Sequence, residues 1–203
     1  MADGVHQLPR GRHRLSREQV LRSQRGRMLR AVAEATADKG FGRVTVADII
    51  SRAGVSRETF YEHFSDKEDC FMAVLDVGAR TLFEILSSSI DRPGEEPLER
   101  FEDMLKAYLN TLAAEPAFAK AFLIDAYAAG PAATERRLEL QQRFVDLVAE
   151  IFRGSADRFA CEACVAAISS MVTSRVGRGR IEELPALREP LVGFVARVVG
   201  PAG

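Results

Sequence analysis

The sequence is poor in the residues that cross-link exported proteins and that catalyse most acid–base reactions. It has only three cysteines, Cys70, Cys161 and Cys164. An odd number of cysteines without an export signal predicts free thiols in a reducing cytoplasm rather than a disulfide framework. The three histidines all lie within the first 63 residues, so the rest of the chain lacks the commonest general base. Together with the absence of a phosphate-binding glycine loop, a nucleophile elbow and an HExxH motif, this disfavours an enzyme.

Long hydrophobic runs are also missing. The longest uncharged stretch covers residues 163–174 and includes several serines and threonines, whereas a membrane-spanning helix needs about 20 mostly apolar residues. The first residues are polar and rich in arginine, without the apolar segment of a signal peptide. We therefore expect a cytoplasmic protein with no membrane partner, no cofactor and no bound metal.

The charges are unevenly distributed, although the net charge is only −1. Residues 1–64 contain 12 Lys and Arg against 7 Asp and Glu, whereas residues 65–203 contain 16 against 22. A basic segment attached to an acidic body favours an anionic partner, such as nucleic acid, at the N-terminal end. Chance clustering of solvated charges is the alternative at this point.

Helical periodicity dominates the chain, and no segment alternates as a strand would. The pattern predicts an all-α fold with about nine helices, at residues 23–39, 45–53, 56–63, 66–88, 97–114, 116–129, 132–153, 157–176 and 188–199. Residues 177–187 are expected to form a loop. We divide the chain into a flexible Arg-rich arm (1–20), an N-terminal helix-turn-helix domain (21–66) and a C-terminal helical domain (67–203).

Several helix ends carry local signals. Thr45-x-x-Asp48 and Ser65-x-x-Glu68 both match a capping box, in which a hydroxyl and a carboxylate pair with unsatisfied backbone N–H groups. Ser56 is the expected cap of the helix between them. Gly40 follows the first helix where a left-handed C-terminal cap is needed.

The helices at 45–53 and 56–63, joined by residues 53–55, have the layout of a helix-turn-helix motif. Val55, Phe60 and Phe64 line the inner side of the second helix, which leaves its polar side chains outward. In a major groove such a face places Arg57 against guanine and Glu58 against cytosine N4. The candidate DNA-binding residues are Thr45, Ser56, Arg57, Glu58, Thr59, Tyr61, His63 and Lys67. An ordinary helical hairpin with solvated charges is the alternative.

The helix N-termini near Thr45 and Ser65 offer further N–H groups to phosphate. Arg10, Arg12 and Arg14 of the arm can enter a minor groove, or they can form a solubilising tail.

The runs RMLRAVAEATADKGF and VTVADIISRAGVSRETFYEHFSDKEDC are similar to the DNA-binding domain of the TetR family of transcriptional regulators. The resemblance covers about residues 25–72, and AGVSxxTFYxHFxxKE is a specific signature. It assigns DNA contacts to Thr45, Ser56, Arg57, Thr59, Tyr61, His63 and Lys67. Glu58 departs from the pattern, because a small residue is common there.

The resemblance further implies a homodimer formed by the last two helices and a small-molecule pocket in the C-terminal domain. The helix at 157–176 is rich in small side chains, and the final helix carries an apolar stripe, so both suit close pairing across a two-fold axis. The candidate interface residues are Cys161, Cys164, Ile168, Met171, Leu191, Phe194, Val195 and Val198. Intramolecular core is the alternative role for both helices.

Aromatic and apolar residues at helical spacing supply the candidate pocket, with two hydroxyls and one carboxylate as possible polar contacts. The candidate pocket residues are Phe101, Met104, Tyr108, Phe122, Asp125, Tyr127 and Phe144. Most such residues belong to the core, and a solvated surface carboxylate is the alternative role for Asp125.

These observations predict a DNA-binding regulator, a repressor released from a near-palindromic operator by a small apolar or amphipathic ligand. One alternative is a regulator that needs no effector or that responds to oxidation of Cys161 and Cys164. A small all-α enzyme is a further alternative.

Overall fold

The computed structural model describes residues 17–88 and 94–199. Within these ranges the chain forms nine α-helices and no strand, which confirms the all-α prediction. The helices are α1 (Arg17–Lys39), α2 (Val46–Ala53), α3 (Arg57–His63), α4 (Lys67–Ser87), α5 (Pro97–Ala114), α6 (Pro116–Leu123), α7 (Pro131–Ile151), α8 (Arg158–Gly177) and α9 (Arg188–Val199). The described residues also contain three short 3-10 helices, η1 (Phe41–Arg43), η2 (Asp125–Tyr127) and η3 (Ile181–Leu187).

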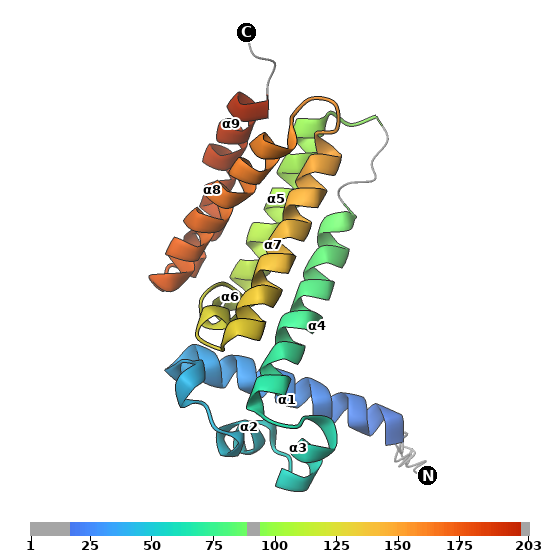
Figure 1. Ribbon diagram of the computed structural model, residues 1–203, viewed down its shortest axis with the longest axis vertical. Coiled ribbons are helices and arrows are strands. Elements are labelled where there is room, and N and C mark those ends of the chain that lie inside the picture. Colours follow the sequence, from blue (N-terminus) through green and yellow to red (C-terminus); the bar gives the residue numbers. More distant parts are fainter. Residues whose placement is uncertain (1–16, 89–93, 200–203) are drawn as a thin grey trace, which may run out of the picture.

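The molecule is elongated, with α1, α2 and α3 at one end and the remaining helices above them (Figure 1). Helix α4 starts beside α3 and runs up along α7, whereas α8 and α9 lie together at the opposite edge. At 1.5 Å rise per residue, a helix of this length spans about 30 Å. Helix α4 therefore connects the helix-turn-helix end with the middle of the body.

One hydrophobic core joins the helix-turn-helix end to the start of α4. Met28 of α1, Ile49 of α2 and Phe60 of α3 are fully buried, and the ring of Phe71 in α4 lies 4.7 Å from that of Phe41. Buried aromatic and aliphatic side chains of this size each stabilise the fold by about 1.5–3 kcal/mol. The first helices therefore cannot form this core without the start of α4.

Helix α6 attaches the body to α1. The Lys120 ammonium donates a hydrogen bond to the carbonyl of Ala37. Phe118 of α6 packs so closely on Gly78 of α4 that a Cβ at Gly78 would lie 1.8 Å from its ring. Glycine in a helix interior costs about 1 kcal/mol relative to alanine, and here the close approach of Phe118 accounts for it.

Some helix boundaries differ from those expected. Residues 17–20, which we assigned to the arm, form the first turn of α1, while Arg10, Arg12 and Arg14 lie outside the described residues. Helix α6 ends at Leu123 rather than at 129, and the chain continues as η2, in which Asp125 and Ala126 are buried. The expected loop at 177–187 contains η3, which buries Leu184 and Leu187.

The capping predictions had mixed outcomes. The Thr45–Asp48 capping box is present with both hydrogen bonds, and Ser56 caps α3. The Ser65–Glu68 box was wrong, since Asp66 caps α4 and the Ser65 N–H donates to Asp69. Gly40 has a positive φ of 78° but a ψ of 143°, so it is not a left-handed helical cap.

Candidate nucleic-acid interface and ligand cavity

The turn between α2 and α3 is fixed by glycine and by an arginine from another helix. Gly54 adopts the left-handed conformation, with φ 62° and ψ 47°, and its N–H bonds the carbonyl of Ile50. The Arg27 guanidinium of α1 donates to the carbonyl of Ala53 at 2.9 Å. These contacts satisfy carbonyls that the end of α2 would leave without partners, and they hold α3 at its angle.

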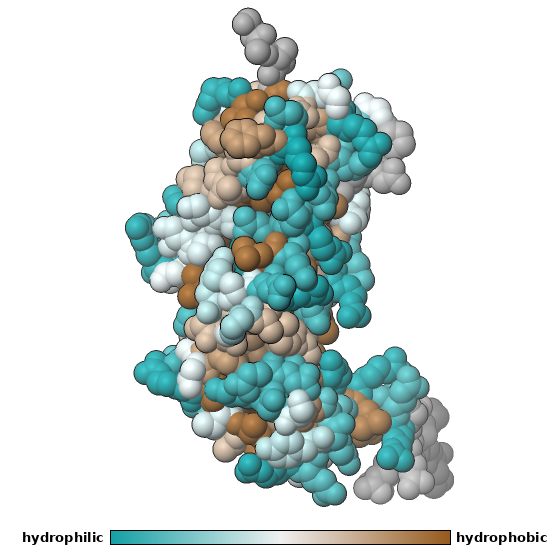
Figure 2. Space-filling model, in the orientation of Figure 1, coloured by the Kyte–Doolittle hydropathy of each residue, from teal (hydrophilic) through white to brown (hydrophobic). Residues whose placement is uncertain are grey.

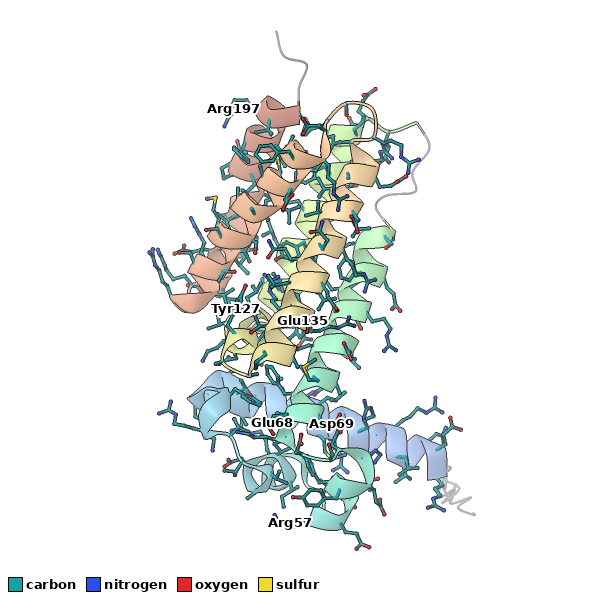
Figure 3. All side chains as sticks on the ribbon, in the orientation of Figure 1. Arg57, Glu68, Asp69, Tyr127, Glu135 and Arg197 are labelled. Carbon is teal, nitrogen blue, oxygen red and sulfur yellow. The ribbon has the colours of Figure 1, made fainter. Side chains whose placement is uncertain are left out.

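Helix α3 has a buried apolar side and an exposed polar side. Phe60 and the following Phe64 are 0% and 2% exposed, with ring centroids 5.8 Å apart. On the opposite side Arg57 is exposed and Tyr61 is 49% exposed, and the Arg57 guanidinium lies 5.7 Å from the Tyr61 ring centroid. Arg57 projects from the extreme lower end of the molecule (Figure 3). This placement suits contact with a large partner.

The remaining predicted contacts are less uniform. Thr45, Ser56 and Glu58 are exposed, whereas Thr59 is half-buried. The hydroxyls of Ser56 and Thr59 are hydrogen-bonded to each other at 3.0 Å. All four lie at the start of α2 or of α3, on the same end of the molecule as Arg57.

His63 and Lys67 face partly inward. The Nε2 atom of His63 is buried without a hydrogen-bond partner, so that atom does not face solvent. The Lys67 ammonium donates to the Phe41 carbonyl at 3.4 Å and lies 4.6 Å from the Phe41 ring centroid. Contact between these two side chains and phosphate stays a prediction, and Lys67 would have to leave Phe41 to make it.

Carboxylates occupy the helix N-termini that we expected to bind phosphate. The Asp48 carboxylate accepts from the backbone N–H of Thr45 at 2.8 Å, and hydrogen bonds from Lys39 and then Thr45 hold its pKa well below the usual range. At α4, Asp66 accepts from the Asp69 N–H at 2.7 Å. A phosphate would meet like charge at these two termini, which makes them poor anion sites.

One cation near α3 was not predicted. The Arg25 guanidinium of α1 lies 4.6 Å from the ring centroid of Phe64, at the end of α3. Sequence spacing gives no signal for it, because the contact joins two residues that lie almost 40 positions apart in the chain. The lower end of the face in Figure 2 is mainly hydrophilic. A basic side chain beside this surface adds sequence-independent attraction to phosphates.

A small cavity lies inside the body, among α4 to α8. Its volume is about 40 Å³, close to the share of liquid volume that one water takes, about 30 Å³. Five of the seven predicted pocket residues line it, namely Phe101, Met104, Tyr108, Phe122 and Phe144. The other lining residues are Leu86, Leu105, Arg137, Gln141, Val148, Val165, Ile168 and Ser169.

Of the three polar side chains that we expected in this cavity, only Tyr108 lines it. Burial raises the pKa of the Tyr108 hydroxyl to about 12, although the nearby Arg137 opposes the shift, so Tyr108 remains a neutral donor. Asp125 and Tyr127 do not line the cavity. Asp125 faces the Phe41 backbone, where burial raises its pKa, and Tyr127 is 52% exposed beside the turn between α6 and α7 (Figure 3).

Comparison with known proteins gives these two regions a context. A family model described as "Bacterial regulatory proteins, tetR family" matches residues 28–74, which include the whole of α2 and α3. The segment that forms α2 and α3 thus has the sequence pattern of this family.

Two curated relatives from mycobacteria illustrate the match. The HTH-type transcriptional activator FasR of Mycolicibacterium smegmatis is 36% identical over 67 residues, covering 33% of this chain and 31% of FasR. The HTH-type transcriptional repressor KstR2 of Mycobacterium tuberculosis is 31% identical over 90 residues, covering 44% of each chain. The chain thus matches less than half the length of either relative.

The similarity in fold extends over more of the chain than the similarity in sequence. The transcriptional regulator FadR from Bacillus subtilis, solved in complex with stearoyl-CoA, superposes with a TM-score of 0.74. The superposition covers 88% of this chain and 99% of FadR at 16% identity. At that identity the likeness concerns the fold alone, including the helical body that follows the TetR-type helix-turn-helix.

The residues that we expected at a dimer interface divide into two groups. Cys161, Cys164, Ile168, Leu191 and Val195 are at most 8% exposed within a single chain. Met171 and Phe194 are half-buried, and Val198 is 37% exposed. Only the second group offers appreciable surface to a partner. Hydrophobic residues also gather over α9 and the adjoining part of α8 in Figure 2.

Phe159, at the start of α8, was missed. It is 79% exposed, the highest value among the exposed large hydrophobic residues of the described chain. Its exposure was hard to predict, because the N-terminal turn of a helix has few neighbours to bury a side chain. An aromatic side chain so exposed is typical of a protein interface.

The buried cysteines do not support the alternative based on oxidation. Cys161 and Cys164 are fully buried, and burial raises the pKa of both thiols, that of Cys164 to about 11. Because the thiolate is the reactive species, thiols with raised pKa values are poor redox sensors.

The residues that the structure describes give little sign of a metal site or of a membrane span. No group of three or more His, Cys, Asp or Glu there could hold a metal ion. Helix α8 alone among those residues is long and apolar enough to cross a membrane. This is weak support for a span, since buried residues such as Val172 pack α8 into the core and core helices meet the same criterion.

Proposed function

We propose that this protein is a homodimeric transcriptional repressor that binds a near-palindromic operator and releases it when a small molecule enters the cavity. It acts in the cytoplasm as a DNA-binding regulator and has no catalytic activity. The observation that carries the proposal is the exposure of Arg57 and Tyr61 on α3, on the side opposite two buried phenylalanines. A helix braced in this way can enter a major groove with its N-terminal residues at base edges.

The dimer follows from the geometry of DNA. Two recognition helices read half-sites one turn apart only when they are separated by about 34–36 Å. The exposed apolar residues of α8 and α9, Phe159 and Val198 together with the half-buried Phe194, are the interface we propose. This interface leaves α3 of each protomer exposed at the far end of the molecule.

The ligand acts through α4. Leu86 of α4 lines the cavity, and the ring of Phe83 lies 4.7 Å from that of Phe144, another lining residue. Small-molecule sites usually occupy about 300–1,000 Å³, so a ligand can enter this cavity only if its walls move. Binding therefore favours a different position of α4, and only such differential affinity can shift the population away from DNA.

The relatives include both directions of regulation, since FasR is an activator and KstR2 is a repressor. Release by ligand fits repression better, because a shift of a few ångströms in α4 spoils simultaneous docking of both α3 helices. Stearoyl-CoA, bound by FadR, is one amphipathic probe for this release.

Selection from a random duplex library tests DNA binding directly. The full-length protein is expected to enrich a near-palindrome with half-sites about one turn, 10 base pairs, apart. The variant Arg57→Ala is expected to lose selectivity at one position in each half-site. Failure of the wild-type protein to enrich any sequence would contradict the proposed function.

A further inference from the structure

Arg137 is a buried cation on the wall of the cavity. Its residue is 3% exposed, and its guanidinium lies 4.8 Å from the ring centroid of Phe122. Its hydrogen bonds go to neutral oxygens, Gln141 Oε1 at 3.3 Å and Ser169 Oγ at 3.1 Å. The Nε atom is buried and has no hydrogen-bond partner.

The preceding residue shows how unusual this environment is. Arg136 pairs with Asp76 at 2.7 Å and with Glu139 at 2.9 Å, while remaining partly exposed. Arg137 has no carboxylate within ion-pair distance among residues 17–88 and 94–199. A buried charge without a counter-charge is costly, and neutral partners offset only part of that cost.

Packing alone does not require an arginine at this position. Residues 133, 137, 140, 144 and 148 follow one another at intervals of three or four, so they share a face of α7. The other four are Ala133, Leu140, Phe144 and Val148, of which only Phe144 is more than slightly exposed. An aliphatic residue at 137 would continue this apolar stripe, whereas the arginine interrupts it inside the cavity.

The guanidinium has capacity left for a ligand. Arginine carries five N–H donors in a planar fork that matches the oxygens of carboxylate or phosphate, and two hydrogen bonds from Arg137 are used here. The neutral hydroxyl of Tyr108 lines the same cavity, and most of the remaining wall is apolar. An apolar site with a few convergent polar groups is typical of small-molecule binding.

We propose that the cavity binds an amphipathic molecule whose anionic oxygen group pairs with Arg137 and whose apolar part lies among α4 to α8. This inference rests on the proposed effector-responsive function and names the chemistry of the effector. Carboxylate and phosphate headgroups share the required chemistry. The apolar part enlarges the cavity by displacing lining side chains such as Phe144, which contacts Phe83 of α4.

Calorimetric titration of the full-length protein tests the charge requirement without DNA. The probes are decanoate, decyl phosphate and decanol, which share an alkyl chain and differ in the headgroup. Wild-type protein is expected to bind at least one of the two anions roughly ten-fold or more tightly than decanol, the scale of hydrogen bonds to a charged group. The stronger of the two anions identifies the headgroup.

Arg137→Met is expected to remove this preference while leaving decanol affinity within about two-fold, because methionine keeps the length and apolar surface of the side chain. Arg143→Met is the matched control. It removes the same charge from α7, but Arg143 is exposed over the Phe83 ring, 4.2 Å from its centroid, and does not line the cavity. This control is expected to keep the wild-type preference.

The melting temperature gives a second readout. Replacing an unpaired buried charge by a hydrophobic residue is often neutral or stabilising, so Arg137→Met is expected to melt at or above the wild-type temperature. Equal affinity of wild type for the three probes would overturn the inference, as would an unchanged preference in Arg137→Met. Duplex binding by the same proteins separates this failure from failure of the regulator proposal, since it does not depend on Arg137.

Discussion

The two ends of α4 face opposite kinds of surroundings. At its start, α3 turns polar side chains such as Arg57 and Tyr61 toward solvent and buries its phenylalanines. At its other end, Leu86 borders a small, mainly apolar cavity in which Arg137 is the buried cation. One region presents charge to a large partner outside the molecule, and the other holds charge for a small partner inside it.

This difference shows how one helix can couple two kinds of binding. The N-terminal region needs rigidity, because base readout depends on the angle of α3. The cavity needs compliance, because its volume of about 40 Å³ must grow before a ligand fits. The following predictions alter one region at a time, beginning with the largest expected effect.

Phe60→Ala removes a buried side chain that supports α3. Phe60 is fully buried beneath α3, and truncation of a buried phenylalanine typically costs about 3–5 kcal/mol. Urea unfolding is expected to show this loss together with weakened DNA binding. Glu62→Ala, on the exposed side of the same helix, is the control and is expected to change stability by less than about 0.5 kcal/mol. Equal stability of the two variants would show that Phe60 does not brace the helix.

Arg57→Ala removes an exposed positive charge from α3 and leaves the core intact. A base-contacting arginine is expected to contribute about 1–3 kcal/mol at particular base pairs. Fluorescence anisotropy with operator duplexes that carry single base-pair changes measures this contribution. A uniform loss of affinity across all duplexes would instead assign Arg57 to the phosphate backbone.

Thr45→Ala tests the N-terminal cap of α2, the first helix of the helix-turn-helix. The Thr45 hydroxyl accepts from the Asp48 N–H at 3.2 Å, and loss of such a cap costs about 1 kcal/mol of stability. Thr45→Ser keeps the hydroxyl and is expected to keep most of the stability in urea unfolding. If the serine variant lost as much as the alanine variant, the hydroxyl would not be the stabilising group.

The smallest expected effect is an acid dependence from the same capping box. Hydrogen bonds from Lys39 and Thr45 lower the folded-state pKa of Asp48 below its unfolded value. Its contribution is therefore complete above about pH 4 and is lost as the pH falls toward the folded pKa. The difference in unfolding free energy between wild type and Asp48→Asn is expected to narrow, without vanishing, as the pH falls from 6 to 3. A constant difference across this range would contradict the linkage.

The helix-turn-helix was predictable because its signals are local. Thr45 with Asp48, Gly54, and the spacing of Phe60 and Phe64 each act within a few residues, and the structure bears them out. The Ser65 box failed because Asp66, one residue later, competes for the same N–H groups. Arg25 and Arg27 were missed because their contacts with Phe64 and Ala53 join separate helices.

The body was less predictable because its site is assembled from several helices. Periodicity found five lining residues of the cavity but could not distinguish Tyr127, which is exposed, from Tyr108, which is buried. A signal for Arg137 did exist, as a charged residue on the apolar stripe of α7. The interface residues on α8 were overstated because small apolar side chains such as Cys161 pack equally well within one chain.

The most direct test measures the distance between the two α3 helices of the dimer. Glu62→Cys places an exposed thiol on α3 for a spin label, while the three native thiols are buried. Pulsed electron–electron double resonance with the selected operator is expected to give one narrow distribution of label-to-label distances, which corresponds to helices about 34–36 Å apart. In DNA-free protein, the ligand that binds more tightly, decanoate or decyl phosphate, is expected to shift the distance between the two labels and to broaden its distribution. An unchanged distribution on addition of both DNA and ligand would contradict coupling through α4.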